Sequence, residues 1–151
     1  MSAILIVEDD KNLQVTLSHI LQEEGFEVIS TMWGSMALEE VKRGNADLIL
    51  LDLMLPGMNG MQVLERVKKI DKHLPVIMIT GYGSAESAVR AIELGAYDYI
   101  NKPFDYEKLI SKISKALKKS KRKKRGPLGR ALKKISADLR DTKDSMLGNN
   151  K

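Results

Sequence analysis

The sequence predicts an α/β protein with a doubly wound, five-stranded parallel sheet and five helices. Five short apolar or β-branched runs alternate with five helix-length segments along residues 1–119. The connections between them are short, and three runs are apolar almost throughout, as strands buried on both faces are. Residues 120–151 form a basic tail, in which a short amphipathic helix is expected over residues 128–147.

The strands are expected at the five short runs. The first, third and fourth runs are the most apolar, so we place them in the interior of the sheet. The second run mixes polar and apolar residues, which suits a position nearer an edge. The expected strands are Ala3–Val7, Glu27–Thr31, Asp47–Leu51, Pro75–Thr80 and Asp98–Asn101.

The helices are expected where apolar residues recur at three- and four-residue spacing. Gly25 ends the first helix and Gly95 ends the fourth, because glycine readily adopts the conformation that terminates a helix. The second helix is expected to begin at a cap provided by Ser35. The expected helices are Lys11–Glu24, Ser35–Arg43, Gly60–Ile70, Ser84–Leu94 and Tyr106–Lys119.

Charge and composition divide the chain into an acidic domain and a basic tail. Residues 1–117 hold 12 Lys/Arg and 17 Asp/Glu, whereas residues 118–151 hold 13 Lys/Arg and 3 Asp/Glu. There is no cysteine, which excludes disulfides, thiolate catalysis and cysteine-ligated metals. No apolar run approaches the ~20 residues of a membrane span, and no signal-peptide pattern opens the chain. We therefore expect a cytoplasmic protein without a membrane partner.

Charged and hydroxyl residues follow the ends of four expected strands. Because the carboxyl ends of parallel strands lie side by side, these residues should meet in one crevice, where open α/β sheets bind their ligands. Taken singly, such acids commonly cap helices or start turns. Their coincidence at one edge favours a site, and clustered carboxylates of this kind suit Mg²⁺. The residues are Glu8, Asp9, Asp10, Asp52, Thr80 and Lys102.

Four ordered segments resemble the receiver domain of bacterial two-component response regulators, which is flavodoxin-like in fold. The resemblance covers about residues 1–119, and around residues 79–109 it is greatest to receivers of nitrogen-regulator-type transcription activators. The segments are Ile-Leu-Ile-Val-Glu-Asp-Asp at 4–10, Asp-Leu-Met-Leu-Pro-Gly-Met-Asn-Gly at 52–60, Ile-Thr-Gly-Tyr-Gly at 79–83 and Gly-Ala-Tyr-Asp-Tyr-Ile-Asn-Lys-Pro-Phe at 95–104.

The resemblance implies that Asp52 accepts a phosphoryl group from a sensor histidine kinase in a reaction that needs Mg²⁺ or Mn²⁺. Glu8 and Asp9 match the family's acidic pair, with Asp9 the more direct metal ligand and Asp10 peripheral. The backbone carbonyl of Met54 would complete the protein's ligands. Such a domain promotes its own phosphorylation and dephosphorylation without being a conventional enzyme.

The resemblance also implies contacts to the phosphoryl oxygens from Lys102 and Thr80, and a switch role for Tyr99 beside Thr80. Phosphorylation would then change the face formed by the expected fourth helix, fifth strand and fifth helix, which controls an output partner and promotes a homodimer. The Lys102–Pro103 bond is expected to be cis. For Tyr99, ordinary packing of an aromatic residue in a sheet is the alternative.

Two other classes of protein match the sequence less well. A phosphatase resembling haloacid dehalogenases needs a second aspartate two residues after its nucleophile, where this chain has Met54. A flavin or nucleotide carrier needs a glycine-, serine- or threonine-rich phosphate loop after the first strand. The acidic residues 8–10 stand there instead and would repel a phosphate.

The basic run 118–125 has two interpretations. A solvated linker is favoured, and binding of nucleic acid by charge is the alternative. The chain is thus either a stand-alone receiver with a basic tail or the N-terminal part of a DNA-binding transcription activator whose output domain is absent here. Heptad-spaced residues in the tail would suit a linker helix: Leu128, Leu132, Ile135, Leu139, Thr142 and Met146.

Overall fold

The computed structural model describes residues 1–124, with side chains for residues 1–120. Its strands are β1 (Ala3–Val7), β2 (Glu27–Thr31), β3 (Leu48–Leu51), β4 (Val76–Thr80) and β5 (Asp98–Asn101). They form one parallel sheet in the order β2-β1-β3-β4-β5, within a compact unit that spans Met1–Leu117. The predicted sheet is confirmed, with β2 at an edge. The expected helix at 128–147, with its heptad-spaced residues, lies outside the described residues.

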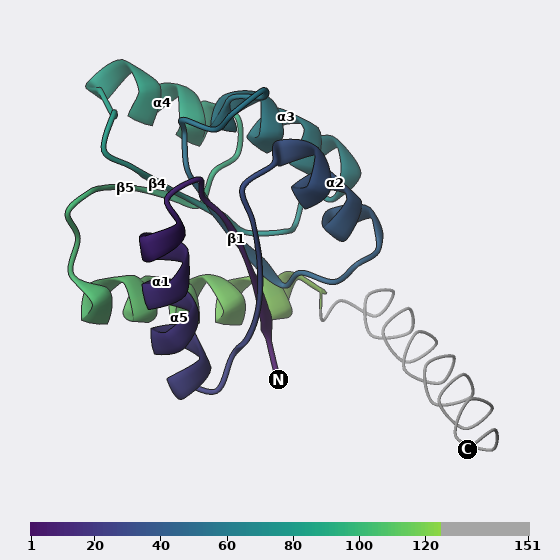
Figure 1. The fold of residues 1–151 in the computed structure, drawn as a ribbon. Coiled ribbons are helices and arrows are strands. Elements are labelled where there is room, and N and C mark those ends of the chain that lie inside the picture. Colours follow the sequence, from purple (N-terminus) through teal and green to yellow (C-terminus); the bar gives the residue numbers. More distant parts are fainter. Residues whose placement is uncertain (125–151) are drawn as a thin grey trace, which may run out of the picture. The chain divides into compact units, whose positions relative to one another are not determined.

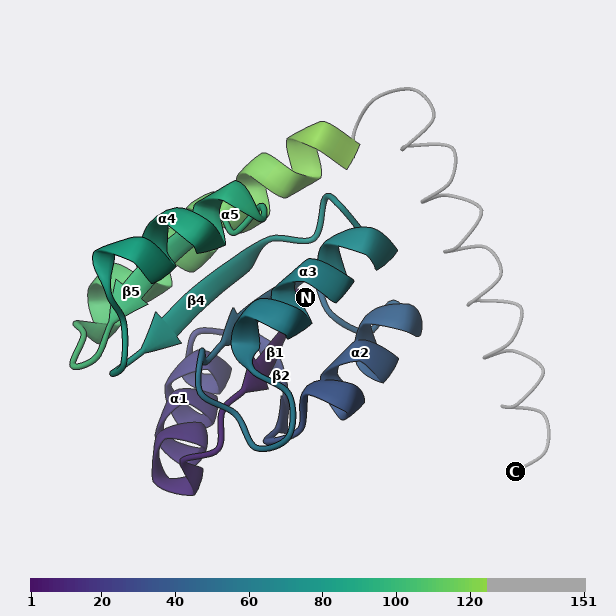
Figure 2. The ribbon, with the colours of Figure 1, turned by 90° about the horizontal axis from the view of Figure 1, so that it is seen from above.

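Five helices cover the two faces of this sheet. They are α1 (Lys11–Glu23), α2 (Gly34–Lys42), α3 (Gly60–Ile70), α4 (Ala85–Glu93) and α5 (Tyr106–Lys124). Helices α1 and α5 lie on one face, and α2, α3 and α4 lie on the other (Figure 1, Figure 2). Alternate residues of each central strand pack toward opposite faces: Leu5 and Val7 contact the α2–α4 side, whereas Ile4 and Ile6 contact the α1 and α5 side. Burial on both faces explains why these strands are continuously apolar.

The register of the sheet brings the carboxyl ends of its strands to one edge. Val7, the last residue of β1, pairs with Leu51, the last residue of β3. Thr80, the last residue of β4, likewise pairs with Asn101 at the end of β5. The residues that follow these strands therefore emerge together, as the alternation of strands and helices predicted.

Helix α2 begins one residue earlier than predicted, and Ser35 is not its cap. The N-cap is Trp33, whose side chain makes no capping hydrogen bond, and Gly34 is the first helical residue. A Cβ atom at Gly34 would lie 2.6 Å from Val63 Cγ2 on α3. Close packing of α2 against α3 therefore explains the glycine at the first position of this helix, which starts without a side-chain cap.

Helix α5 is longer than predicted. The expected end was Lys119, but the helix continues through Lys124. Lysine and arginine have high helix propensity, so the basic run extends the helix and does not terminate it. Within the described part of the chain, no helix combines the length and the apolar character that crossing a bilayer requires.

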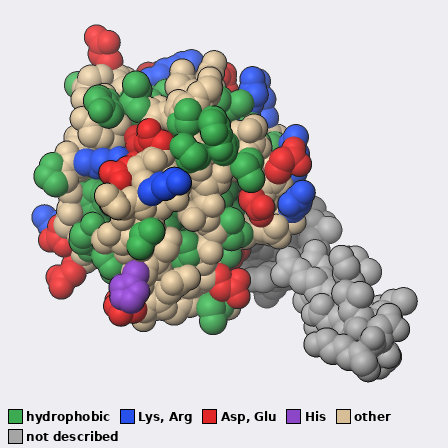
Figure 3. All heavy atoms as spheres, in the orientation of Figure 1, with side chains coloured by type: hydrophobic (Ala, Val, Ile, Leu, Met, Phe, Trp, Pro, Cys, Tyr) green, Lys and Arg blue, Asp and Glu red, His purple; other side chains and the backbone are tan. Residues whose placement is uncertain are grey.

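Helix α4 is the least buried of the helices packed on its face of the sheet. Ala91 is its one buried residue, whereas Val89 and Ile92 are 58% and 51% exposed. Hydrophobic side chains reach the surface in the upper part of Figure 3, the region where Figure 1 labels α4. This helix is therefore attached to the sheet by few apolar contacts.

Candidate functional site

Glu8, Asp52 and Lys102 meet at the carboxyl edge because the backbone pairing continues one residue beyond the strands. The Asp52 amide donates to the last carbonyl of β1 at 2.9 Å, and the Lys102 amide donates to the Thr80 carbonyl at 2.9 Å. The Lys102–Pro103 peptide bond is cis, the form that the family resemblance implied. Three different strands thus deliver charged side chains to one place.

The Lys102 ammonium lies between two buried carboxylates. Its Nζ is 2.9 Å from Glu8 Oε2, 3.0 Å from Glu8 Oε1 and 3.0 Å from Asp52 Oδ2. Glu8 and Asp52 are only 1% and 3% exposed, and the Lys102 side chain is 24% exposed. Two carboxylates beside one ammonium carry an excess negative charge that a further cation would offset.

Asp9 adds a third carboxylate to this pair. One oxygen each from Glu8, Asp9 and Asp52 lies within 4.8 Å of the others. Asp9 is exposed, whereas the other two are buried, so the group opens to solvent on the Asp9 side. A set of carboxylate oxygens with room for water is the ligand set that Mg²⁺ and Mn²⁺ prefer. The donors present therefore fit the cation that the sequence predicted.

The pKa of Glu8 is raised to about 7, chiefly by burial and also by the nearby Asp52, while Lys102 acts in the opposite direction. Burial alone would lower the pKa of Lys102, but its hydrogen bonds and charge interactions with Glu8 and Asp52 outweigh burial and raise it. Lys102 consequently stays charged, while Glu8 is close to protonation at neutral pH. A cation beside Glu8 would favour its ionised form.

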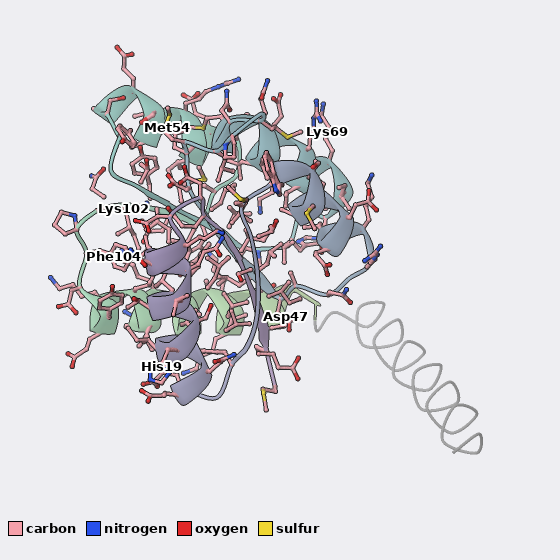
Figure 4. All side chains as sticks on the ribbon, viewed as in Figure 1. His19, Asp47, Met54, Lys69, Lys102 and Phe104 are labelled. Atoms are coloured by element: carbon pink, nitrogen blue, oxygen red, sulfur yellow. The ribbon has the colours of Figure 1, made fainter. Side chains whose placement is uncertain are left out.

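Met54 lies next to the Asp52 carboxylate. Its amide nitrogen donates to Asp52 Oδ1 at 3.2 Å, while Asp52 Oδ2 accepts from Lys102. Figure 4 shows Met54 and Lys102 near one end of the sheet and Asp47 near the other. Each oxygen of the Asp52 carboxylate thus has its own donor, which fixes the orientation of the group.

Asp10 and Gln14 connect the end of β1 to helix α1. Asp10 is the N-cap of α1, because its Oδ1 accepts from Asn12 N at 3.0 Å and from Leu13 N at 3.2 Å. Gln14 Nε2 donates to the Glu8 carbonyl. An acid directly before a helix signals a cap, so the role of Asp10 is readable from sequence. The contact of Gln14 depends on how α1 packs beside β1, and no local pattern signals it.

Thr80 and Tyr99 are both attached to the segment that leads from β4 into α4. Thr80 is fully buried, and its Oγ1 accepts from the Tyr82 amide at 3.1 Å. The Tyr99 hydroxyl lies 2.8 Å from Ser87 Oγ on α4. Sequence reasoning did not find Ser87. The Ser-x-x-Ser pattern at 84–87 indicates the start of a helix, but it does not predict the contact of Ser87 with Tyr99 on β5.

A family model for the response regulator receiver domain matches residues 4–114. This chain belongs to the response regulator receiver family. Among curated relatives, the DNA-binding response regulator MtrA of Mycolicibacterium smegmatis is 40% identical over 117 residues, which cover 78% of this chain and 51% of that protein. The chain spans about half the length of the curated regulators of this kind that it matches.

Solved receiver structures share the fold. A CheY-like receiver domain protein from Methanospirillum hungatei is 33% identical with a TM-score of 0.78, over 82% of this chain and 98% of that one. NtrX from Brucella abortus is 36% identical with a TM-score of 0.74, over 92% of this chain and 30% of that one. The flavodoxin-like receiver fold that the four segments implied is therefore confirmed.

Proposed function

We propose that Asp52 accepts a phosphoryl group from a histidine of a sensor histidine kinase in the cytoplasm, and that the domain acts as a phosphorylation-dependent switch. Receiver domains of response regulators are phosphorylated by sensor histidine kinases. The observation that carries the proposal is the position of the buried Asp52 carboxylate. It lies 3.0 Å from Lys102 Nζ and within 4.8 Å of oxygens of Glu8 and Asp9.

In the proposed reaction, an oxygen of Asp52 attacks phosphorus. The new P–O bond forms as the P–N bond to the donor imidazole breaks, and the imidazole nitrogen keeps the electron pair. The product is an aspartyl phosphate, which is a form of nucleophilic catalysis by a carboxylate. Lys102 is placed to pair with a phosphoryl oxygen once its contacts with the two carboxylates loosen.

The same residues would hold the metal. Glu8, Asp9, Asp52 and the backbone carbonyl of Met54 are the proposed ligands of Mg²⁺ or Mn²⁺. When bound, the cation neutralises charge on the oxygens of the transferring phosphoryl group. The amide of Met54 orients Asp52 through Oδ1, so the nucleophile is positioned by the protein itself.

Thr80 and Tyr99 would report the modification. Thr80 Oγ1 is the acceptor in its bond to the Tyr82 amide, so its own hydrogen remains for a phosphoryl oxygen. Movement of Thr80 would then change the space open to Tyr99 and alter the α4-β5-α5 face. We propose that this face controls the output partner and promotes a homodimer. Sedimentation of residues 1–151 and 1–119, with and without beryllofluoride, distinguishes the contribution of this face to dimer formation from that of the tail.

The direct test is incubation with acetyl phosphate and Mg²⁺. The wild-type protein should acquire one base-labile, hydroxylamine-sensitive phosphoryl group, and Asp52→Asn should acquire none. Asp10→Asn is the matched control, because it removes the same charge beside the acidic pair while asparagine still caps α1. Equal labelling of the wild type and Asp52→Asn would exclude Asp52 as the acceptor.

A second proposal concerns the output. The match to NtrX covers 92% of this chain but only 30% of NtrX. This observation favours a chain that is the N-terminal part of a longer DNA-binding transcription activator, with a stand-alone receiver whose basic tail binds nucleic acid as the alternative. We expect weak DNA binding that disappears as salt is raised. Sequence-specific binding that survives high salt would favour the alternative.

A further inference from the structure

Tyr99 of β5 is bonded to the first turn of α4 through one side chain. Its hydroxyl oxygen lies 2.8 Å from Ser87 Oγ. Ser87 is also the third residue of α4 and closes the capping box of this helix: Ser84 Oγ accepts from the Ser87 amide at 3.1 Å, and Ser87 Oγ accepts from the Ser84 amide at 2.9 Å. A single oxygen therefore belongs both to the helix cap and to the contact with Tyr99.

Either hydroxyl can donate in this contact, and the choice depends on where the Ser87 hydrogen points. A serine hydroxyl has one hydrogen, and Ser87 Oγ lies 3.0 Å from the Ser84 carbonyl, which can only accept. With that hydrogen directed at Ser84, Ser87 Oγ accepts from the Tyr99 hydroxyl. The Ser84 hydroxyl also approaches Ser87 Oγ, at the longer distance of 3.2 Å. In that arrangement Tyr99 is the donor at the shortest hydroxyl contact of this group, and in the other arrangement Ser87 donates to Tyr99; both keep the bond between β5 and α4.

The loop before α4 leaves the Tyr99 hydroxyl little room. A Cβ atom on Gly83 would lie 2.4 Å from the Tyr99 hydroxyl oxygen, 2.5 Å from Asn101 Oδ1 and 3.0 Å from Tyr99 Cε1. The loop therefore closes over the ring on one side while Ser87 binds its hydroxyl. Any displacement of Tyr99 must break the bond to Ser87 or move the start of α4.

Few other contacts resist such a movement. Ala91 is the one buried residue of α4, and Ala88 and Ser87 itself are half-buried. A helix with little buried apolar surface is held weakly, so a single hydrogen bond is a large share of its attachment.

We infer that Ser87 is a positioning residue that couples the Tyr99 side chain to the N-terminal turn of α4. The inference rests on the proposed function, in which the Asp52 site and Tyr99 are linked through Thr80. The hydroxyl at position 87 thereby sets the strength of the coupling between the Asp52 site and the position of α4. A serine and a threonine supply this hydroxyl, whereas an alanine does not.

The test measures the apparent dissociation constant for beryllofluoride at saturating Mg²⁺, followed by fluorine NMR on residues 1–151. If the bond couples the two elements, Ser87→Ala and Tyr99→Phe should shift this constant in the same direction, each by about three- to tenfold. The double variant should shift it no further than either single one, because both changes remove the same bond. Ser87→Thr should behave as the wild type.

Ser84→Ala is the matched control, because it removes the N-cap hydroxyl and leaves Ser87 and Tyr99 in place. It should lower the melting temperature without changing the beryllofluoride constant. Unchanged constants in both single variants, additive effects in the double variant, or an equal shift in Ser84→Ala would overturn the role of Ser87 alone. A wild-type protein that binds no beryllofluoride would instead refute the proposed function, and this inference with it.

Discussion

The connections from β3 to α3 and from β4 to α4 begin alike but are anchored differently. Each leaves a central strand beside the site, after Asp52 in one case and Thr80 in the other, and each enters its helix through a capping box. Helix α3 buries Gly60, Val63, Leu64 and Val67, whereas α4 buries Ala91. The proposed nucleophile, Asp52, is thus attached to a well-packed connection, and the segment proposed to respond to its phosphorylation is one that can move at low free-energy cost.

The largest expected difference between the two helices is in stability. Leu64→Ala on α3 should lower the free energy of unfolding by about 2–5 kcal/mol, because Leu64 is fully buried between α3 and the sheet. Ile92→Ala on α4 should lower it by about 1 kcal/mol or less, since that side chain is 51% exposed. Denaturant unfolding of both variants makes the comparison. Equal losses would show that α4 is as firmly packed as α3.

The buried Glu8 carboxyl group should make the free energy of unfolding depend on pH in the metal-free protein. The pKa of Glu8 is about 7 in the folded state, against the unperturbed value of 4.5 that applies to the unfolded chain. Between these values the folded protein holds a proton that the unfolded chain has lost, so the free energy of unfolding should fall by roughly 3 kcal/mol as pH rises from 4.5 to 7.

Unfolding titrations without Mg²⁺ over this pH range make the measurement. Glu8→Gln should remove this fall in the free energy of unfolding. Tyr99→Phe, which changes a residue in contact with α4, should leave the fall unchanged. Mg²⁺ should stabilise the protein more at pH 8 than at pH 5, because binding requires the carboxylate form. If the free energy of unfolding of Glu8→Gln falls by the same amount over this pH range, a group other than Glu8 causes the pH dependence.

A smaller difference in stability is expected when a glycine is replaced by alanine in each connection, at Gly60, the first residue of α3, and at Gly83 before α4. A Cβ atom at Gly60 would lie 2.2 Å from the Asp52 carbonyl oxygen and 2.7 Å from Leu53 Cα, so Gly60→Ala must displace backbone and should cost about 1–3 kcal/mol. At Gly83 the obstructing atoms belong to the ends of the Tyr99 and Asn101 side chains, which can turn away.

Gly83→Ala should therefore cost less than Gly60→Ala, by melting temperature, and should displace the Tyr99 hydroxyl. Phosphorylation by acetyl phosphate should slow in Gly60→Ala, where the backbone of the proposed nucleophile Asp52 moves, and persist in Gly83→Ala. A larger loss of stability in Gly83→Ala would mean that the β4–α4 connection is the more rigid of the two.

The sequence predicts the positions of the strands and the residues at their ends, because both are local. Continuous apolar runs identify buried strands, and parallel strands necessarily bring Asp52, Thr80 and Lys102 to one edge. What it does not predict depends on packing between distant elements. At Gly34, the first residue of α2, α3 packs too close for a side chain, and Ser35 is not the cap of this helix.

The partners of the site side chains belong to the same class of tertiary detail. The contact of Lys102 with both Glu8 and Asp52 requires the folded register of β1, β3 and β5, as well as side-chain conformations that no spacing specifies. The bond between Tyr99 and Ser87 likewise joins a strand to a helix that precedes it in the chain. Long-range contacts of this kind carry the coupling that we propose.

Amide hydrogen exchange with and without beryllofluoride, at constant Mg²⁺, tests the central claim most directly. We expect exchange to change in the β4–α4 loop, α4 and β5, while the amides of α3 beyond its first turn exchange at the same rate in both samples. A protein whose amides are unaffected by beryllofluoride, or whose α3 changes as much as α4, would contradict the account.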